Sequence, residues 1–93
     1  MFEPRIRPVT MNDLERRQFV RKAKADALAY DAAQLLSKGE TGQAATLAGQ
    51  CMSLAGPEQF TLWLRHYATT RFKISSPAVD AFIGSVPRVE IAL

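Results

Sequence analysis

Residues 10–38 read TMNDLERRQFVRKAKADALAYDAAQLLSK, and this stretch decides the fold of the chain. It contains no Gly or Pro and is rich in Ala and in long unbranched side chains, which favour helix. Thr10 and Asp13 stand at the spacing of a capping box, with Asp in place of the usual Glu, and Gly39 follows as a helix-ending residue. The stretch predicts a single helix, roughly 42 Å long at 1.5 Å per residue.

Three shorter helices are predicted downstream, each from its own local signals. Residues 41–55 repeat apolar side chains every three or four positions, the pattern of a helix with one buried face. Residues 57–72 begin with Pro at the first helical position, where its missing amide proton costs nothing. A fourth helix, over 77–86, is stopped by Gly84 and Pro87.

Both ends of the chain are predicted to be extended. Residues 1–9 contain Pro4 and Pro8, which disfavour helix. Residues 87–93 alternate polar and apolar side chains, a strand-like period that would suit pairing with the N-terminal arm. The predicted fold is a single all-α domain, a small bundle of about four helices with extended N- and C-terminal segments.

Composition agrees with a small globular protein. The 93 residues are 47% hydrophobic and 23% charged, and a chain of this size buries roughly 60–65% of its unfolded surface, enough for one modest core. The formal net charge of +3 gives a weak bias toward anionic partners. The chain has one cysteine, no signal-peptide layout and no apolar run near the roughly 20 residues of a membrane span. We therefore expect a cytoplasmic protein that contacts no membrane.

No catalytic or metal-binding pattern is recognisable, so we expect a non-enzymatic protein with no metal, cofactor or small-molecule substrate. His66, the only histidine, falls on the flank of its helix, which favours a surface role over acid–base chemistry. Cys51 falls on the apolar face of the 41–55 helix, which favours a buried thiol over a reactive thiolate. The carboxylates are scattered and form no close pair for general acid–base work.

The 10–38 helix carries a cluster of cations. Arg17, Arg21 and Lys24 recur at i, i+4 and i+7, so they share one face that spans about 10 Å. We predict that this basic face binds a partner, either neighbouring phosphates or an acidic patch. The alternative is a solvated helix face, partly compensated by Asp13 and Glu15.

A nucleic-acid interface is the second hypothesis for these cations. It would add Arg16 and Lys22 of the same cluster, together with Arg65 and Arg71, which are interleaved with aromatic residues. A helix-turn-helix reader is disfavoured, because residues 57–60 carry a negative charge and no cation where such a reader exposes donors.

The apolar residues of the 10–38 helix fall on two sides. The first stripe is Phe19, Val20, Ala23, Ala27 and Tyr30, and the roughly opposite one is Leu28, Ala32, Leu35 and Leu36. A helix that is apolar on two sides is central in a core or is covered by another chain. The predicted stripe of the 57–72 helix, taken as core, is Phe60, Trp63, Leu64 and Tyr67.

The polar face of the 41–55 helix is unusual because it bears no charge. No charged residue lies between Glu40 and Glu58, and the cores of protein interfaces are depleted of charge in the same way. Gln43, Thr46 and Gln50 are therefore a second predicted partner-binding surface.

These features favour a protein–protein interaction module, such as a small adaptor, chaperone-like protein or inhibitor, working as a homodimer or in a hetero-complex. A small basic nucleic-acid-binding transcriptional regulator is the alternative function. The competing structural explanation is that the two C-terminal helices cover the excess apolar surface by themselves.

Overall fold

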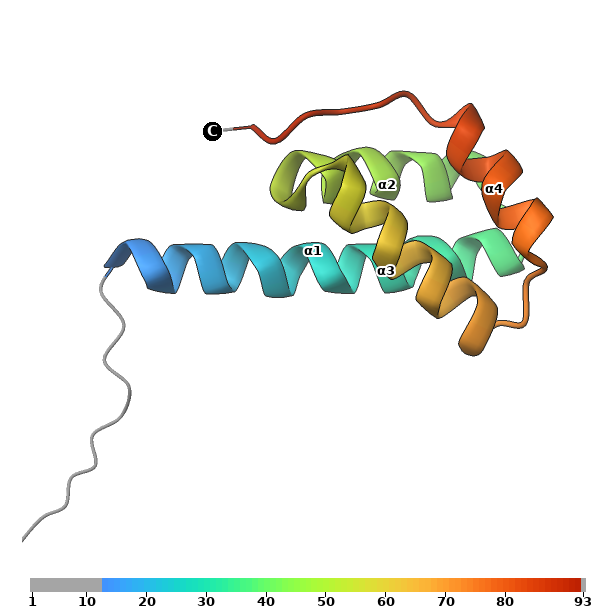
Figure 1. The fold of residues 1–93 in the computed structure, drawn as a ribbon, viewed down its shortest axis with the longest axis horizontal. Helices are drawn as coiled ribbons and strands as arrows, with labels where there is room; N and C mark the ends of the chain where they lie inside the picture. The colour runs from blue at the N-terminus through green and yellow to red at the C-terminus, as the bar shows by residue number, and fades with distance from the viewer. Residues whose placement is uncertain (1–12, 93) are drawn as a thin grey trace, which may run out of the picture.

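The computed structural model describes residues 13–92 and contains four helices joined by short turns (Figure 1). They are α1 (Asp13–Ser37), α2 (Thr41–Ala55), α3 (Pro57–Thr70) and α4 (Ser76–Ser85). The predicted all-α fold of about four helices is confirmed, and 13–92 contain no strand. The predicted cap at Thr10 and the extended arm over 1–9 lie outside the described residues.

A tight turn folds α2 back along the second half of α1. Gly39 adopts a φ of 78°, the left-handed conformation in which a side chain would be strained. The amide of Glu40 donates to the carbonyl of Leu35 and the amide of Gly39 to that of Leu36, both at 3.0 Å. These two bonds form the Schellman motif that satisfies the last carbonyls of a helix, so the predicted role of Gly39 is confirmed.

The two helices of this hairpin pack through small side chains. Their buried residues are Ala25, Ala29, Ala32 and Ala33 of α1 and Ala44, Ala48, Cys51 and Met52 of α2. The Cys51 thiol donates a hydrogen bond of 3.2 Å to the backbone carbonyl of Ala25, so a side chain of α2 reaches the main chain of α1. Such close approach is possible because alanine extends only one carbon from the backbone.

The structure corrects the predicted burial of α1. Phe19, Val20, Ala23 and Ala27, predicted as one apolar stripe, are exposed. The buried face is instead the alanine row that begins at Ala25. The alanine row is buried because its small side chains let the backbone of α2 approach most closely. Phe19 and Val20 stay exposed because the start of α1 extends past the end of α2 (Figure 1).

Helix α3 crosses one side of the α1–α2 hairpin (Figure 1). Gly56, with a φ of 93°, turns the chain between α2 and α3. Phe60 and Leu64 are buried as predicted, whereas Trp63 and Tyr67 of the same predicted stripe are only half-buried. They lie toward the edge of the core because the alanine row occupies its centre.

Helix α4 is attached to α3 by its own apolar side and by one ion pair. Its cap is Ser75, whose hydroxyl oxygen accepts a hydrogen bond from the amide of Ala78 at 3.4 Å. Val79 and Phe82 are buried, and Arg65 of α3 pairs with Asp80 of α4 at 2.6 Å. The boundaries differ from the predicted ones by at most two residues, apart from the undescribed start of α1, because helix ends are weakly specified by local sequence.

The C-terminal tail is extended, as predicted, but within 13–92 it pairs with no strand. It runs back over α2 (Figure 1), and the amide of Ala92 donates to the carbonyl of Ser53 at 2.8 Å. The side chains of Val89 and Ile91 lie against Gly49 and Gly56. The alternating pattern therefore reflects packing of every second residue on a helix, which needs the same two-residue period as a sheet.

The alanine row predicts that a larger side chain at one of its positions lowers the stability of the fold. Replacing Ala29, which is fully buried, with Leu should destabilise the protein by about 1–3 kcal/mol, because the hairpin has no room for three more carbons. Ala27→Leu, at an exposed position of the same helix, is the matched control and should change the free energy of unfolding by no more than about 0.5 kcal/mol. Urea unfolding followed by circular dichroism measures both, and equal stability of the two variants would contradict the packing described.

Candidate protein-binding surface

Residues 13–24 of α1 precede its buried alanine row, and the start of this segment projects beyond the end of α2 (Figure 1). We call this segment the α1 extension. Leu14, Phe19 and Val20 are 60%, 63% and 55% exposed, and they are three of the five large apolar residues exposed within 13–92. Adjacent residues of a helix point about 100° apart, so Phe19 and Val20 lie on different sides of this segment. Each side therefore presents an exposed apolar residue beside cations, as interaction sites on proteins do.

The α1 extension also concentrates the positive charge of the chain. Its five cations are Arg16, Arg17, Arg21, Lys22 and Lys24. Asp13 and Glu15 are its only carboxylates, so the segment carries a formal charge of +3, equal to that of the whole chain. A positive end on an otherwise nearly neutral molecule attracts partners of negative charge.

The predicted basic face lies around a hollow of about 400 Å³ beside the end of α2. Arg17, Arg21 and Lys24 line it together, as their helical spacing predicts, and Arg16 joins them. Its apolar members are Val20 of α1 and Leu54 of α2. The structure therefore adds an apolar floor to the basic face, which sequence reasoning missed because Leu54 comes from another helix.

The predicted uncharged face of α2 is also on the surface. Gln43, Thr46 and Gln50 are all exposed. Gln43 and Thr46 line a second hollow, of about 270 Å³, together with Leu47 of α2 and Leu35 of α1. Here too the structure places apolar side chains from both helices beneath polar ones.

The two hollows lie on the same side of the hairpin. On α2, Leu47 and Leu54 are seven residues apart and therefore share a face, and the same holds for Leu28 and Leu35 on α1. Lys24 stands one turn before Leu28 on that face. We call this side the α1–α2 face, and it brings together the two surfaces that the sequence predicts separately.

Helix α3 lies on the other flank of α1. Tyr67 of α3 donates a hydrogen bond of 2.5 Å to the carboxylate of Asp26, which raises the pKa of Tyr67, and its ring meets that of Tyr30 edge-on at 5.2 Å. On the same flank, Phe19 of the α1 extension and Trp63 of α3 line a hollow of about 340 Å³. The α1–α2 face is thus the side of the hairpin that α3 leaves open.

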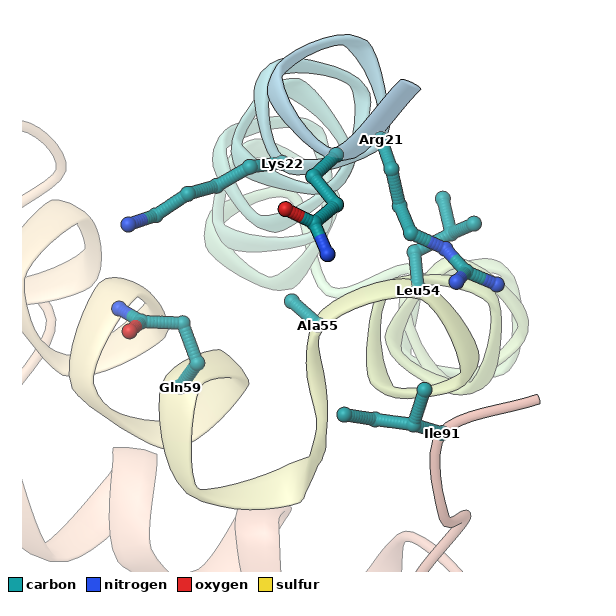
Figure 2. Close-up of a pocket in the computed structure, with 7 residues that line it drawn as sticks. Arg21, Lys22, Leu54, Ala55, Gln59 and Ile91 are labelled. Atoms are coloured by element: carbon teal, nitrogen blue, oxygen red, sulfur yellow. The ribbon is translucent and has the colours of Figure 1, made fainter. Parts of the chain in front are cut away.

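A fourth hollow, of about 360 Å³, lies where the core ends beneath the α1 extension (Figure 2). Figure 2 shows Arg21 and Lys22 leaving α1 in different directions, with Arg21 running past Leu54 toward the tail. There the Arg21 guanidinium donates a hydrogen bond to the carbonyl oxygen of Ala92. Arg21 therefore has a structural partner, whereas Arg17 and Lys24 are exposed on the basic face.

The cations of the nucleic-acid hypothesis are not gathered on one surface. Arg16 lines the basic hollow, and Lys22 lines the hollows on the two other sides of the extension. Arg65 is paired with Asp80, and Arg71 lies over the ring of Tyr30 at 5.9 Å. Arg16 and Lys22 thus line different hollows of α1, and Arg65 and Arg71 each have a partner side chain.

The side chains considered for catalysis are placed as the sequence predicts. Cys51 is fully buried, and burial, followed by the negative charge of Asp26, raises its pKa from 9.0 to about 12. His66 is exposed, with its ring edge-on to Tyr67 at 5.4 Å. The thiol thus lacks the cationic neighbour that activates a cysteine nucleophile.

Residues 13–92 contain no group of three His, Cys, Asp or Glu side chains arranged to hold a metal ion. None of their helices combines the length and the apolar character required to cross a bilayer.

Comparison of the chain with models of protein families, with curated proteins and with solved structures finds no match.

The raised pKa of Cys51 predicts a loss of stability in alkali. The unfolded chain releases the thiol proton near pH 9, whereas the folded chain retains it until about pH 12. The stabilisation is complete below pH 9, and the free energy of unfolding falls as the pH rises from about 9 to about 12. Urea titrations of the wild type and Cys51→Ala across this range should show the steeper fall in the wild type. Parallel curves would mean that the thiol is not held in its protonated form by the fold.

Proposed function

We propose that this chain is a non-enzymatic protein-binding module that engages a different protein through the α1 extension and the α1–α2 face. One observation carries the proposal: Leu14, Phe19 and Val20 are exposed on a cationic helix that extends beyond the rest of the domain. A helical segment of about twelve residues is marginal in water by itself, so a covering partner would stabilise it. Adaptor, inhibitor and chaperone-like roles in the cytoplasm all fit such a module.

Charge favours a different protein over a second copy of the chain. Two α1 extensions pressed together would oppose two segments of +3 each, and like charges placed face to face at an interface cost several kcal/mol. A partner with carboxylates at the corresponding positions would gain from the same charges. We therefore favour a hetero-complex over the homodimer.

Nucleic-acid binding remains the alternative. The cations of the α1 extension would serve it, but Val20 and Leu54 lie among the side chains of the basic hollow, where a phosphate would lose hydration against apolar surface. The pairing of Arg65 with Asp80 also removes one cation from that hypothesis.

Affinity capture with matched variants tests the proposal. The baits are the tagged wild type, the double variant Phe19→Asp/Val20→Asp, and Leu62→Asp. Leu62 is the control because it is 64% exposed but belongs to α3. We expect one protein to co-purify in near-equal amount with the wild type and Leu62→Asp, and to fall at least about tenfold with the double variant, as for removal of an interface hot spot.

Light scattering of the purified chain, with absorbance at 260 and 280 nm, separates the alternatives. Bound material that absorbs at 260 nm, is digested by nuclease and dissociates steeply with salt would favour nucleic acid.

In the affinity capture, a partner retained equally by all three baits would contradict the role of the α1 extension.

A further inference from the structure

The α1–α2 face presents an apolar row of defined length. Its members are Val20, Leu28 and Leu35 of α1 and Leu47 and Leu54 of α2. The four leucines are half-buried at the edge of the core, and Val20 is exposed. From Val20 to Leu35 the row extends about 22 Å at 1.5 Å per residue, which is the length of four helical turns.

Charge is distributed unevenly along this row. The hollow at the Val20 end is surrounded by Arg16, Arg17, Arg21 and Lys24. The hollow at the Leu35 end is lined by polar but uncharged Gln43 and Thr46. Neither lining contains a carboxylate. Asp31 of α1, exposed and seven residues after Lys24, lies on the same side between Leu28 and Leu35, so the described part of the face carries four cations at one end and one carboxylate toward the other.

Only one kind of occupant satisfies the length, the apolar row and the charge gradient together. A second copy docked parallel would bring cations against cations at the Val20 end, and one docked antiparallel would set those four cations against the single carboxylate of Asp31. A nucleic acid would place phosphates over Leu28, Leu35 and Leu47 without gaining a cation there. An amphipathic helix of about four turns covers the apolar row with one stripe, and it fixes its direction by matching carboxylates to the cationic end.

We infer that the α1–α2 face binds one amphipathic helix of a different protein, with Asp or Glu side chains at the end that lies over the α1 extension. The inference rests on the proposed function and specifies the chemistry of the partner. Docked in this way, the incoming helix occupies the side of the hairpin opposite to α3, so that the α1–α2 pair becomes the middle layer of three.

A synthetic helix tests this inference on the full chain. The probe is a fluorescein-labelled peptide of about four turns, with leucines three and four residues apart and glutamates confined to one end. One control peptide replaces the glutamates with lysines, and the other has the same composition in scrambled order. Fluorescence anisotropy should show binding of the probe at least about tenfold tighter than that of either control, weakening severalfold at high salt as exposed charges are screened.

Two variants of the protein locate the binding. Val20→Asp changes the α1–α2 face and should reduce the affinity for the probe at least about tenfold, as for loss of a buried apolar contact at an interface centre. Leu62→Asp is the control, because Leu62 is 64% exposed but belongs to α3. It should leave the affinity unchanged within about twofold, a change of less than 0.5 kcal/mol by the usual conversion.

Three results would overturn the inference. They are probe binding no tighter than that of the controls, a loss of affinity with Leu62→Asp as large as that with Val20→Asp, and displacement of the probe by duplex DNA at equal concentration. Each leaves the proposed function to be judged separately by affinity capture, where loss of the partner with the Phe19→Asp/Val20→Asp bait still assigns binding to the α1 extension.

Discussion

Close contact between α1 and α2 through alanine is the constraint on which the rest of the structure depends. Ala25, Ala29, Ala44 and Ala48 are fully buried, and the thiol of Cys51 reaches the backbone of α1 at 3.2 Å. Two helices that approach this closely leave no space between them for large side chains. The leucines of the hairpin are therefore displaced to its edges, where they are half-buried and available to a further helix.

A second constraint on the structure is the difference in length between α1 and α2. Helix α1 has 25 residues and α2 has 15, so α1 extends beyond its partner by up to about 15 Å at 1.5 Å per residue. The cations and exposed apolar residues of the chain are concentrated in this excess length. The tail contributes here as well, because Ala92 accepts a hydrogen bond from Arg21 and donates one to Ser53, joining the start of α1 to the end of α2.

The two flanks of the α1 extension differ in chemistry, and that difference gives the proposed interface its specificity. Toward α3, the flank carries Phe19 and Trp63 with the opposite charges of Lys22 and Asp26. Toward α2, it carries four cations around Val20 and Leu54. An acidic amphipathic helix therefore distinguishes two apolar surfaces of the same helix by charge alone.

The sequence by itself determined the number of helices, their approximate ends, the turn at Gly39 and the burial of Cys51. These follow from local signals, namely caps, glycine and proline positions and apolar periodicity, which act within a few residues. It also identified both polar surfaces, because helical spacing fixes which side chains share a face. Only the tertiary structure decided that alanine, and not the Phe19 stripe, is buried in α1, and that the basic and uncharged faces adjoin. Both depend on where α2 and α3 end along α1 and on how closely their backbones approach, and no signal within a single helix specifies either distance.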